Sequence, residues 1–281
     1  MRQVKLILLA NNLVRRPGLL AEHGLAFWLE DGVRRVLFDT GQGLVLCHNA
    51  AALGLKLGQV TDVVLSHGHY DHTGGLAQVA AVAGAVPPRL WMLPAATTAP
   101  RFSRHRDASM HDIGMPAPCR DALPRFARPV SSSDHGPVEI MPGVFATGPV
   151  PQLHAWEITS GFFLDAAGKQ VDDFPDDQAL WLDTAAGVVV LLGCAHAGCI
   201  NTLELIRRQS GGRPLAAIVG GTHLGGADAV RVARTVAALR EFAPAMLVPL
   251  HCTGDAVGVL KHAFPASCRA WGVGDGTTFD M

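Results

Sequence analysis

The chain has 281 residues, of which 49% are hydrophobic and 17% are charged, and its formal net charge is −1 at pH 7. This composition excludes a disordered chain, because it supplies ample apolar material for a buried core. The near-neutral charge argues against nucleic acid or an anionic membrane as the main partner. No apolar run approaches the ~18–20 residues that a membrane-spanning helix needs.

The first apolar run covers residues 6–10 and is shorter than the roughly 7–15 residues of a signal-peptide core. We therefore expect it to belong to a first strand and the protein to be cytoplasmic. The 6 cysteines contain no CxxC pair. In a reducing compartment we expect free thiols, most of them small core residues.

Short apolar runs alternate with helical patterns along the chain. Many of the runs are rich in Val, Ile and Leu, which favours strands with both faces buried. In chain order, the predicted strands are 4–9, 25–29, 35–38, 62–65, 89–93, 138–141, 144–147, 161–164, 179–182, 188–192, 215–219 and 246–250. The predicted helices are 43–53, 74–83, 201–209, 228–242 and 254–263. This order predicts an α/β fold with sheets in the middle and helices outside.

A proline-rich stretch interrupts this pattern. Ten of the 18 prolines lie between Pro87 and Pro142, so regular helix is not expected to persist there. A long irregular stretch in a compact domain typically forms a lid or a binding loop. We interpret residues 94–133 as a lid-like insertion in a single domain spanning residues 1–281. Its basic cluster, formed by Arg101, Arg104 and Arg106, either binds an anionic substrate or lies in a solvated loop.

The most informative segment is the turn after the predicted strand 62–65, which reads Ser-His-Gly-His-Tyr-Asp-His-Thr-Gly-Gly. Imidazole and carboxylate are ligands of zinc and similar divalent ions. Residues two apart in an extended turn can point the same way, so His67 and His69 can hold one ion. Asp71 and His72 then face a neighbouring volume that suits a second ion. This density of ligands makes a purely structural histidine cluster the weaker interpretation.

Three later strands end at or just before a histidine, and a helix is predicted after each one. His196 follows strand 188–192, His223 follows strand 215–219, and His251 follows strand 246–250. Side chains at such strand ends converge on one edge of the sheets, where ligands commonly bind. We expect His196 and His251 to be metal ligands. His223 remains open between a ligand and a substrate contact.

These motifs resemble the metallo-β-lactamase superfamily, which implies a four-layer αββα sandwich with a one- or two-metal site at one edge. The resemblance extends over most of the chain. Phe-Asp-Thr-Gly at 38–41, Gly-Cys-Ala-His at 193–196, Gly-Gly-Thr-His at 220–223 and His-Cys-Thr-Gly at 251–254 are similar to one branch in particular. That branch contains the metal-dependent hydrolases grouped with the archaeal dihydropterin–ribofuranosylaminobenzene phosphate synthase.

The resemblance implies that His67, His69 and His196 hold a first ion and that Asp71, His72 and His251 hold a second. Two usual features are missing from this sequence. The Pro142-Gly143 pair is followed by Val144 where many members have a ligand histidine. Cys194 also stands where many members have a bridging Asp, so it is either a ligand or a small core residue. One or two divalent ions are implied, zinc first, with manganese, iron or magnesium as alternatives.

Several other residues have competing interpretations. Asp39 either orients a ligand histidine or caps a turn. His23 is either an active-site edge residue or an ordinary loop histidine. His154 has a minor claim as the missing ligand.

The function that these observations predict is metal-dependent hydrolysis, in which a metal-activated water attacks a small-molecule ester, lactone, thioester or phosphoester. The catalytic candidates are Asp71, which can accept or orient the proton of water, and His223, which can contact substrate or stabilise developing charge. The resemblance also implies an alternative, C–N bond formation between a pterin alcohol derivative and an arylamine. A non-catalytic metal-binding sensor or effector is the remaining interpretation.

Overall fold

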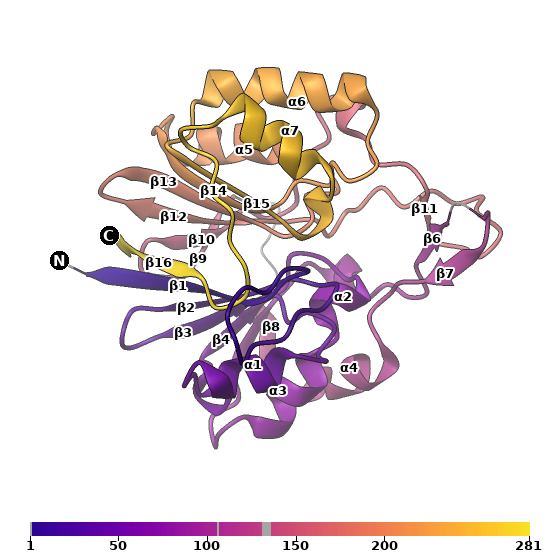
Figure 1. Cartoon of the computed structure of the whole chain (residues 1–281). Coiled ribbons are helices and arrows are strands. Elements are labelled where there is room, and N and C mark those ends of the chain that lie inside the picture. The colour runs from indigo at the N-terminus through magenta and orange to yellow at the C-terminus, as the bar shows by residue number, and fades with distance from the viewer. Residues whose placement is uncertain (1, 106, 131–135) are drawn as a thin grey trace.

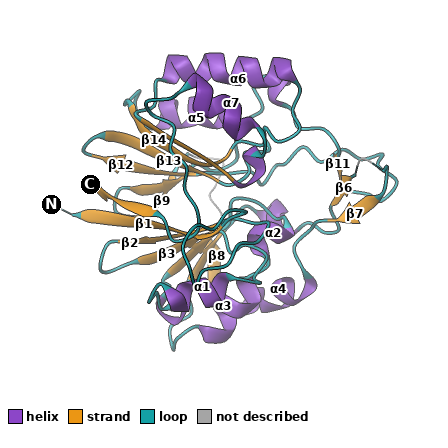
Figure 2. Cartoon of the chain, viewed as in Figure 1, coloured by secondary structure: helices purple, strands orange, loops and turns teal. Residues whose placement is uncertain are grey.

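The computed structural model describes residues 2–105, 107–130 and 136–281. Two β-sheets pack face to face, and helices cover the outer face of each sheet (Figures 1 and 2). This is the four-layer αββα sandwich that the family resemblance implies, and it agrees with the sheets-inside, helices-outside order predicted from the sequence pattern. No helix in the described ranges is long and apolar enough to cross a membrane.

The first sheet has 7 strands in the order β16-β1-β2-β3-β4-β5-β8. In that order, the strands are Gly276–Asp280, Gln3–Ala10, Ala26–Glu30, Arg35–Phe38, Asp62–Val64, Arg89–Trp91 and Ala127–Val130. The helical elements of this half are α1 (Leu46–Ala52), η1 (Leu57–Gln59), α2 (Tyr70–Thr73), α3 (Leu76–Val82), η2 (Pro94–Thr97), α4 (Ala117–Ala122) and η3 (Leu123–Arg125). The last strand, β16, returns to this half and pairs antiparallel with β1, which places the two ends of the chain close together (Figure 1).

The second sheet has 6 strands in the order β15-β14-β13-β12-β10-β9. In that order, they are Met246–Leu250, Leu215–Gly221, Gly187–Leu192, Leu180–Thr184, Val144–Ala146 and Val138–Met141. The helical elements of this half are η4 (Ala155–Glu157), α5 (Cys199–Gln209), α6 (Ala229–Phe242), η5 (His251–Thr253) and α7 (Ala256–Ala263). Because β13, β14 and β15 run parallel, their carboxyl ends meet at one edge.

Three buried apolar clusters hold the four layers together. The middle cluster lies between the sheets and contains alternate residues of β1 and β2 together with residues of β13 and β14, such as Leu8, Phe27, Leu191 and Val219. The other two clusters bury the opposite faces of the same strands against the helices. Both faces of the central strands are therefore buried, which explains why those strands read as continuous apolar runs rather than alternating patterns.

The proline-rich stretch divides between two places. Strands β6 (Phe102–Arg104) and β7 (Met110–Asp112) form a small third sheet with β11 (Phe162–Phe163), which projects from the sandwich (Figure 1). By contrast, α4 packs against α3, and β8 completes the edge of the first sheet. The sequence did not predict α4, which begins with prolines in its first turn, where a missing N–H costs nothing. Residues 131–133 of the expected lid lie outside the described residues.

Both sequence interpretations of Arg101 are wrong, because its side chain is buried and already paired. Its guanidinium makes two hydrogen bonds to the Asp176 carboxylate, at 3.0 and 2.8 Å, and lies 3.4 Å from Asp172. It also donates to the Ala95 carbonyl at 2.9 Å. Arg104 instead lies over the Phe163 ring, 4.6 Å from the centroid, and Arg106 lies outside the described residues. Arg101 thus joins the projecting sheet to the sandwich.

We expect Arg101→Met to lower the free energy of unfolding by about 3–5 kcal/mol, because the change leaves the Asp176 and Asp172 carboxylates buried without their cation. Urea unfolding followed by circular dichroism measures this. Arg125→Met, on the exposed surface of η3, serves as the control and should change stability by less than about 0.5 kcal/mol. Equal stability of the two variants would contradict a structural role for Arg101.

Candidate metal centre

The predicted ligands meet because the strands that precede them end at the same edge. His67 and His69 follow β4 in the first sheet. His196, His223 and His251 follow β13, β14 and β15 in the second sheet. The ends of both sheets face one another here, so a centre built at this edge draws side chains from both halves of the sandwich.

The first ligand group consists of His67, His69 and His196. Each of these histidines offers one ring nitrogen, and the three nitrogens lie within 4.8 Å of one another. The Nε2 of His67 is 3.0 Å from the Nδ1 of His69. All three side chains are buried. Burial lowers the pKa of each imidazole well below its usual range, and the neighbouring histidines add to this effect. The rings are therefore neutral at pH 7 and have lone pairs available for a metal.

The second ligand group surrounds Asp71. Its Oδ2 atom lies 3.2 Å from the Nε2 of His251, 3.2 Å from the Nε2 of His23 and 3.8 Å from the Nε2 of His72. Burial would raise the pKa of Asp71, but the charge of His72 and the contacts with His23 and His251 outweigh it and hold the pKa well below its usual range. Asp71 is therefore ionised at neutral pH. Of the two sequence interpretations of His23, the structure favours the active-site edge residue.

Asp39 holds His72 in place. Its Oδ2 lies 2.6 Å from the Nδ1 of His72, and its Oδ1 accepts a hydrogen bond from the Ser66 backbone at 2.7 Å. The Nε2 of His72 then points to the Sγ of Cys194, 3.1 Å away. Burial alone would lower the pKa of His72, but the Asp39 and Asp71 carboxylates outweigh it and raise the pKa to about 9. A carboxylate bound to the far nitrogen of a histidine is the usual way in which a metal ligand is oriented.

A third group contains sulfur. Cys194, His223 and Cys252 each offer an atom within 4.8 Å of the others. Burial opposes ionisation of Cys252, but its contacts with Cys194 and His223 lower the pKa of its thiol well below the usual range. The sequence interpretation overlooked Cys252, although its position directly after His251 was a visible signal. It expected most cysteines to be core residues and left Cys194 open between a ligand and a core residue, whereas the structure places both sulfur atoms in this group.

His154, the minor candidate for the missing ligand, is not part of the centre. Its Nε2 pairs with Glu204 at 2.9 Å. The Pro142-Gly143 pair lies in the tight connection between β9 and β10. His196 instead completes the first group, with its ring centroid 4.8 Å from that of His67 and 4.7 Å from that of His69.

The donor set fits a divalent ion. Several ring nitrogens of the centre are buried without a hydrogen-bond partner among the described residues: Nε2 of His69, both nitrogens of His196 and Nδ1 of His223. Unpaired buried nitrogens are costly unless something binds them, and a metal ion is the partner that suits neutral imidazoles. Imidazole, carboxylate and thiol donors together favour zinc among the common ions.

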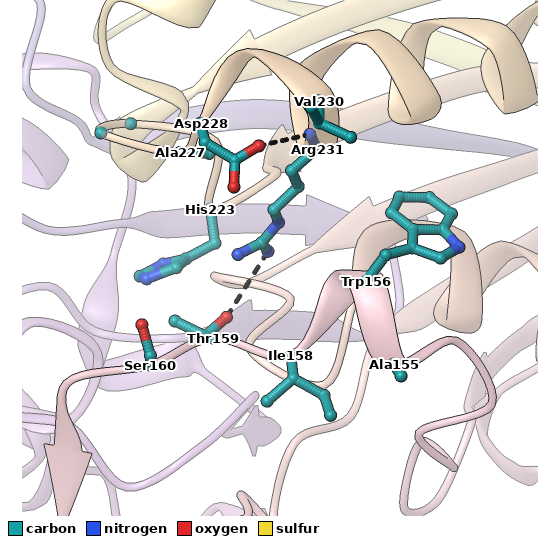
Figure 3. A pocket seen from close by; sticks show the side chains of 12 residues that line it. Ala155, Trp156, Ile158, Thr159, Ser160, His223, Ala227, Asp228, Val230 and Arg231 are labelled. Atoms are coloured by element: carbon teal, nitrogen blue, oxygen red, sulfur yellow. Dashed lines mark hydrogen bonds between the residues drawn. The ribbon is translucent and has the colours of Figure 1, made fainter.

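Two cavities meet at the centre. The inner one has a volume of about 240 Å³ and is lined by ligand candidates together with Ser103, His105, Ile113 and Phe162. The middle of the proline-rich stretch therefore reaches this edge, whereas α4 does not line it. The second cavity, of about 520 Å³, lies between η4 and the start of α6 (Figure 3). His223 lines both cavities.

Comparison with known proteins agrees with this fold. The family model described as the metallo-beta-lactamase superfamily matches residues 20–204. The chain belongs to this superfamily. The structure of Tm1679, described as a metal-dependent hydrolase of the β-lactamase superfamily, is 28% identical with a TM-score of 0.81 and covers 98% of each chain.

Two further relatives differ in what their names say. A 7,8-dihydropterin-6-methyl-4-(β-D-ribofuranosyl)-aminobenzene-5'-phosphate synthase of Methanocaldococcus jannaschii is 28% identical over 250 residues, 83% of this chain and 82% of that protein. A diphosphatase from the PhnP family shares only the fold, with 13% identity and a TM-score of 0.58 over 99% of this chain and 97% of its own. Superfamily membership thus fixes the fold and makes a metal-dependent enzyme the expected class.

Asp39→Asn should weaken binding of one metal equivalent by roughly 10–100-fold, because the amide no longer provides the carboxylate that orients His72. Competition with a chromophoric chelator measures the affinity of each equivalent. Asp121→Asn, on the exposed face of α4, is the matched control and should bind as the wild type does. Unchanged binding in the Asp39 variant would leave Asp39 with the role of a turn residue only.

Proposed function

We propose that this chain is a metal-dependent hydrolase that acts on a small-molecule ester, lactone, thioester or phosphoester. The observation that carries the proposal is the pair of adjacent ligand groups at the wall of one cavity. His67, His69 and His196 would hold one ion, and Asp71, His72 and His251 a second. Zinc is the first choice, with manganese, iron or magnesium as alternatives.

A divalent ion bound there would supply a Lewis acid and lower the pKa of water toward 7. The protein's own residues account for the rest of the chemistry. Asp71 is ionised and lies in the second group, so it can accept or orient the proton of the attacking water. Phe162 and Phe174 pack against the His69 ring, with centroids 5.7 and 5.9 Å away, and exclude bulk water on that side.

His223 contacts the substrate in this proposal. Its backbone has a positive φ of 48°, which is an uncommon conformation for a residue with a side chain. The ring is tilted by 45° against that of His196, with their centroids 4.3 Å apart, and His223 lines both cavities. From this position it can donate a hydrogen bond to an oxygen on which negative charge develops.

A second candidate is a C–N bond-forming transferase of the dihydropterin–ribofuranosylaminobenzene phosphate synthase kind. The observation in its favour is the 28% identity to such a synthase over 83% of this chain. Turnover assays separate the two candidates: hydrolysis of a panel of esters, lactones, thioesters and phosphodiesters, and mass-spectrometric detection of a coupled product from an arylamine and a pterin alcohol derivative. Metal-dependent hydrolysis without coupling supports the first candidate, and coupling without hydrolysis supports the second.

His67→Ala should lose one metal equivalent and about 10²-fold or more in turnover while keeping its fold. The reason is that only two of the three proposed ligands of the first ion remain in this variant. Metal analysis after desalting, together with circular dichroism, checks the result. His111→Ala, in the exposed strand β7, is the control and should keep its metal. Full metal content in the His67 variant would show that the first group is wrongly assigned.

His223→Ala should keep near-normal metal content and lose about 10²–10³-fold in kcat, the usual cost of removing a donor to a developing negative charge. Metal analysis and steady-state kinetics on the same preparation test both parts. If the variant instead loses one metal equivalent, His223 is a ligand, and the group with Cys194 and Cys252 becomes a metal site.

A further inference from the structure

The residues that line the second cavity, apart from His223, have no role in the proposed metal centre. It lies between η4 with the residues after it and the first turn of α6 (Figure 3). His223 forms its boundary with the candidate metal centre. A molecule that occupies both cavities would have its reacting group near the ligands and the rest of its body here.

The side chain of Arg231 enters this cavity with its charge uncompensated. Figure 3 shows the guanidinium pointing between His223 and Thr159 rather than back to its own helix. The hydrogen bond from an Nη of its guanidinium to the Thr159 hydroxyl is long, 3.5 Å, and its Nε is buried without a partner among the described residues. Within the described part of the chain it forms no ion pair. A partly buried guanidinium with free N–H donors is stabilised by an anion that accepts two hydrogen bonds from it.

The carboxylates nearby have other partners. Asp228 caps α6 and accepts a hydrogen bond from the Arg231 backbone N–H at 2.8 Å. Glu157 caps α5, and its two oxygens accept from the backbone N–H groups of Ile200 and Asn201, at 2.9 and 2.7 Å. Thr159 donates its hydroxyl proton to the His196 carbonyl at 3.1 Å, which leaves its oxygen facing Arg231. Burial lowers the pKa of Arg231, against the attraction of Glu157.

The outer wall of the cavity is apolar. Trp156 lies on one side, and Ile158 and Val230 are 51% and 61% exposed at its mouth. Exposed aliphatic side chains beside an indole offer a surface for an aromatic or aliphatic group. The cavity therefore combines one cationic fork, hydroxyls and an apolar wall.

We propose that Arg231 and His223 bind an oxyanion of the substrate, a phosphate or a carboxylate, whose aromatic or aliphatic body lies against Trp156, Ile158 and Val230. Thr159 accepts from the Arg231 guanidinium and helps to position it. This proposal rests on the proposed function, since it names the class of molecule that the same centre acts on: a small anionic substrate with an apolar portion. It moves the anion-binding role from the arginines of the proline-rich stretch to the first turn of α6.

Titration calorimetry of the metal-loaded protein tests the proposal with two probes that the enzyme cannot hydrolyse, phenylphosphonate and phenylacetate. Arg231→Gln should weaken binding of the preferred probe by roughly 10–100-fold, the range for losing hydrogen bonds to a charged group. Arg231→Lys keeps the charge but not the fork and should bind with intermediate affinity. The affinity ratio of the two probes tells whether the anion is a phosphate or a carboxylate.

Arg234→Gln is the matched control, because Arg234 lies one turn along the same helix on its exposed face. It should bind both probes as the wild type does. If Arg231→Gln binds both probes with wild-type affinity, or if Arg234→Gln weakens binding equally, the anion site is wrong. If Arg231→Gln is poorly folded, Arg231→Lys provides the test. Wild-type affinity of Arg231→Lys for both probes would show that the guanidinium does not bind the anion through paired hydrogen bonds.

The same set of variants separates this proposal from the proposed function. Binding that depends on Arg231 in a protein with no hydrolytic turnover would refute the hydrolase and keep the anion site. Hydrolytic turnover, together with probe binding that is unchanged in Arg231→Gln, would support the hydrolase and refute the anion site. His67→Ala, which should lack the first ion, also distinguishes an anion held by Arg231 from one held by the metal, since only the former persists in that variant.

Discussion

The contact between the turn after β4 and the segment 176–178 of the second half positions the whole centre. The Gly68 N–H donates to Asp176 at 2.7 Å, and the Gln178 N–H donates to the Ser66 carbonyl at 2.9 Å. Asp176 is itself held by Arg101. Since His67 and His69 come from one sheet and His196 from the other, their convergence depends on this backbone contact.

Close approach of the backbone at this edge leaves no room for side chains at certain positions. A Cβ atom at Gly68 would lie 2.1 Å from the Ala96 carbonyl oxygen, and one at Gly193 would lie 2.2 Å from the Ser66 hydroxyl. Glycine at these positions lets the ligand turn pass under the neighbouring loop and lets the two sheets meet. The glycines that precede the ligand histidines are therefore part of the packing of the centre.

The electrostatics of the centre also follow from burial. Three buried imidazoles stay neutral, and the carboxylates of Asp39 and Asp71 balance His72. Such a dense set of unpaired donors is unfavourable in a simple structural core, because each buried polar atom without a partner costs free energy. A metal-binding role accounts for all of them at once, and this holds equally for an enzyme and for a metal-binding sensor or effector.

The sequence by itself determined the layers and the turn that carries the ligands. Continuous apolar runs such as β13 and β14 indicate strands buried on both faces. The dense His-Asp motif between β4 and α3 can be identified from its own residues, without knowing which distant segments pack against it. Short or irregular elements were missed: β6, β8 and β16 pair with strands far away in the chain, and β7 pairs only with β6. Nothing local in the sequences of β6, β8 and β16 indicates their distant partners. Tertiary structure alone decided that Arg101 is a buried anchor, that Cys252 and His23 join the centre, and that Arg231 enters the neighbouring cavity. The physical reason is that a charge or a thiol has the same local sequence signal whether it ends in solvent, in an ion pair or in a site; only the packing of segments far apart in the chain distinguishes these outcomes.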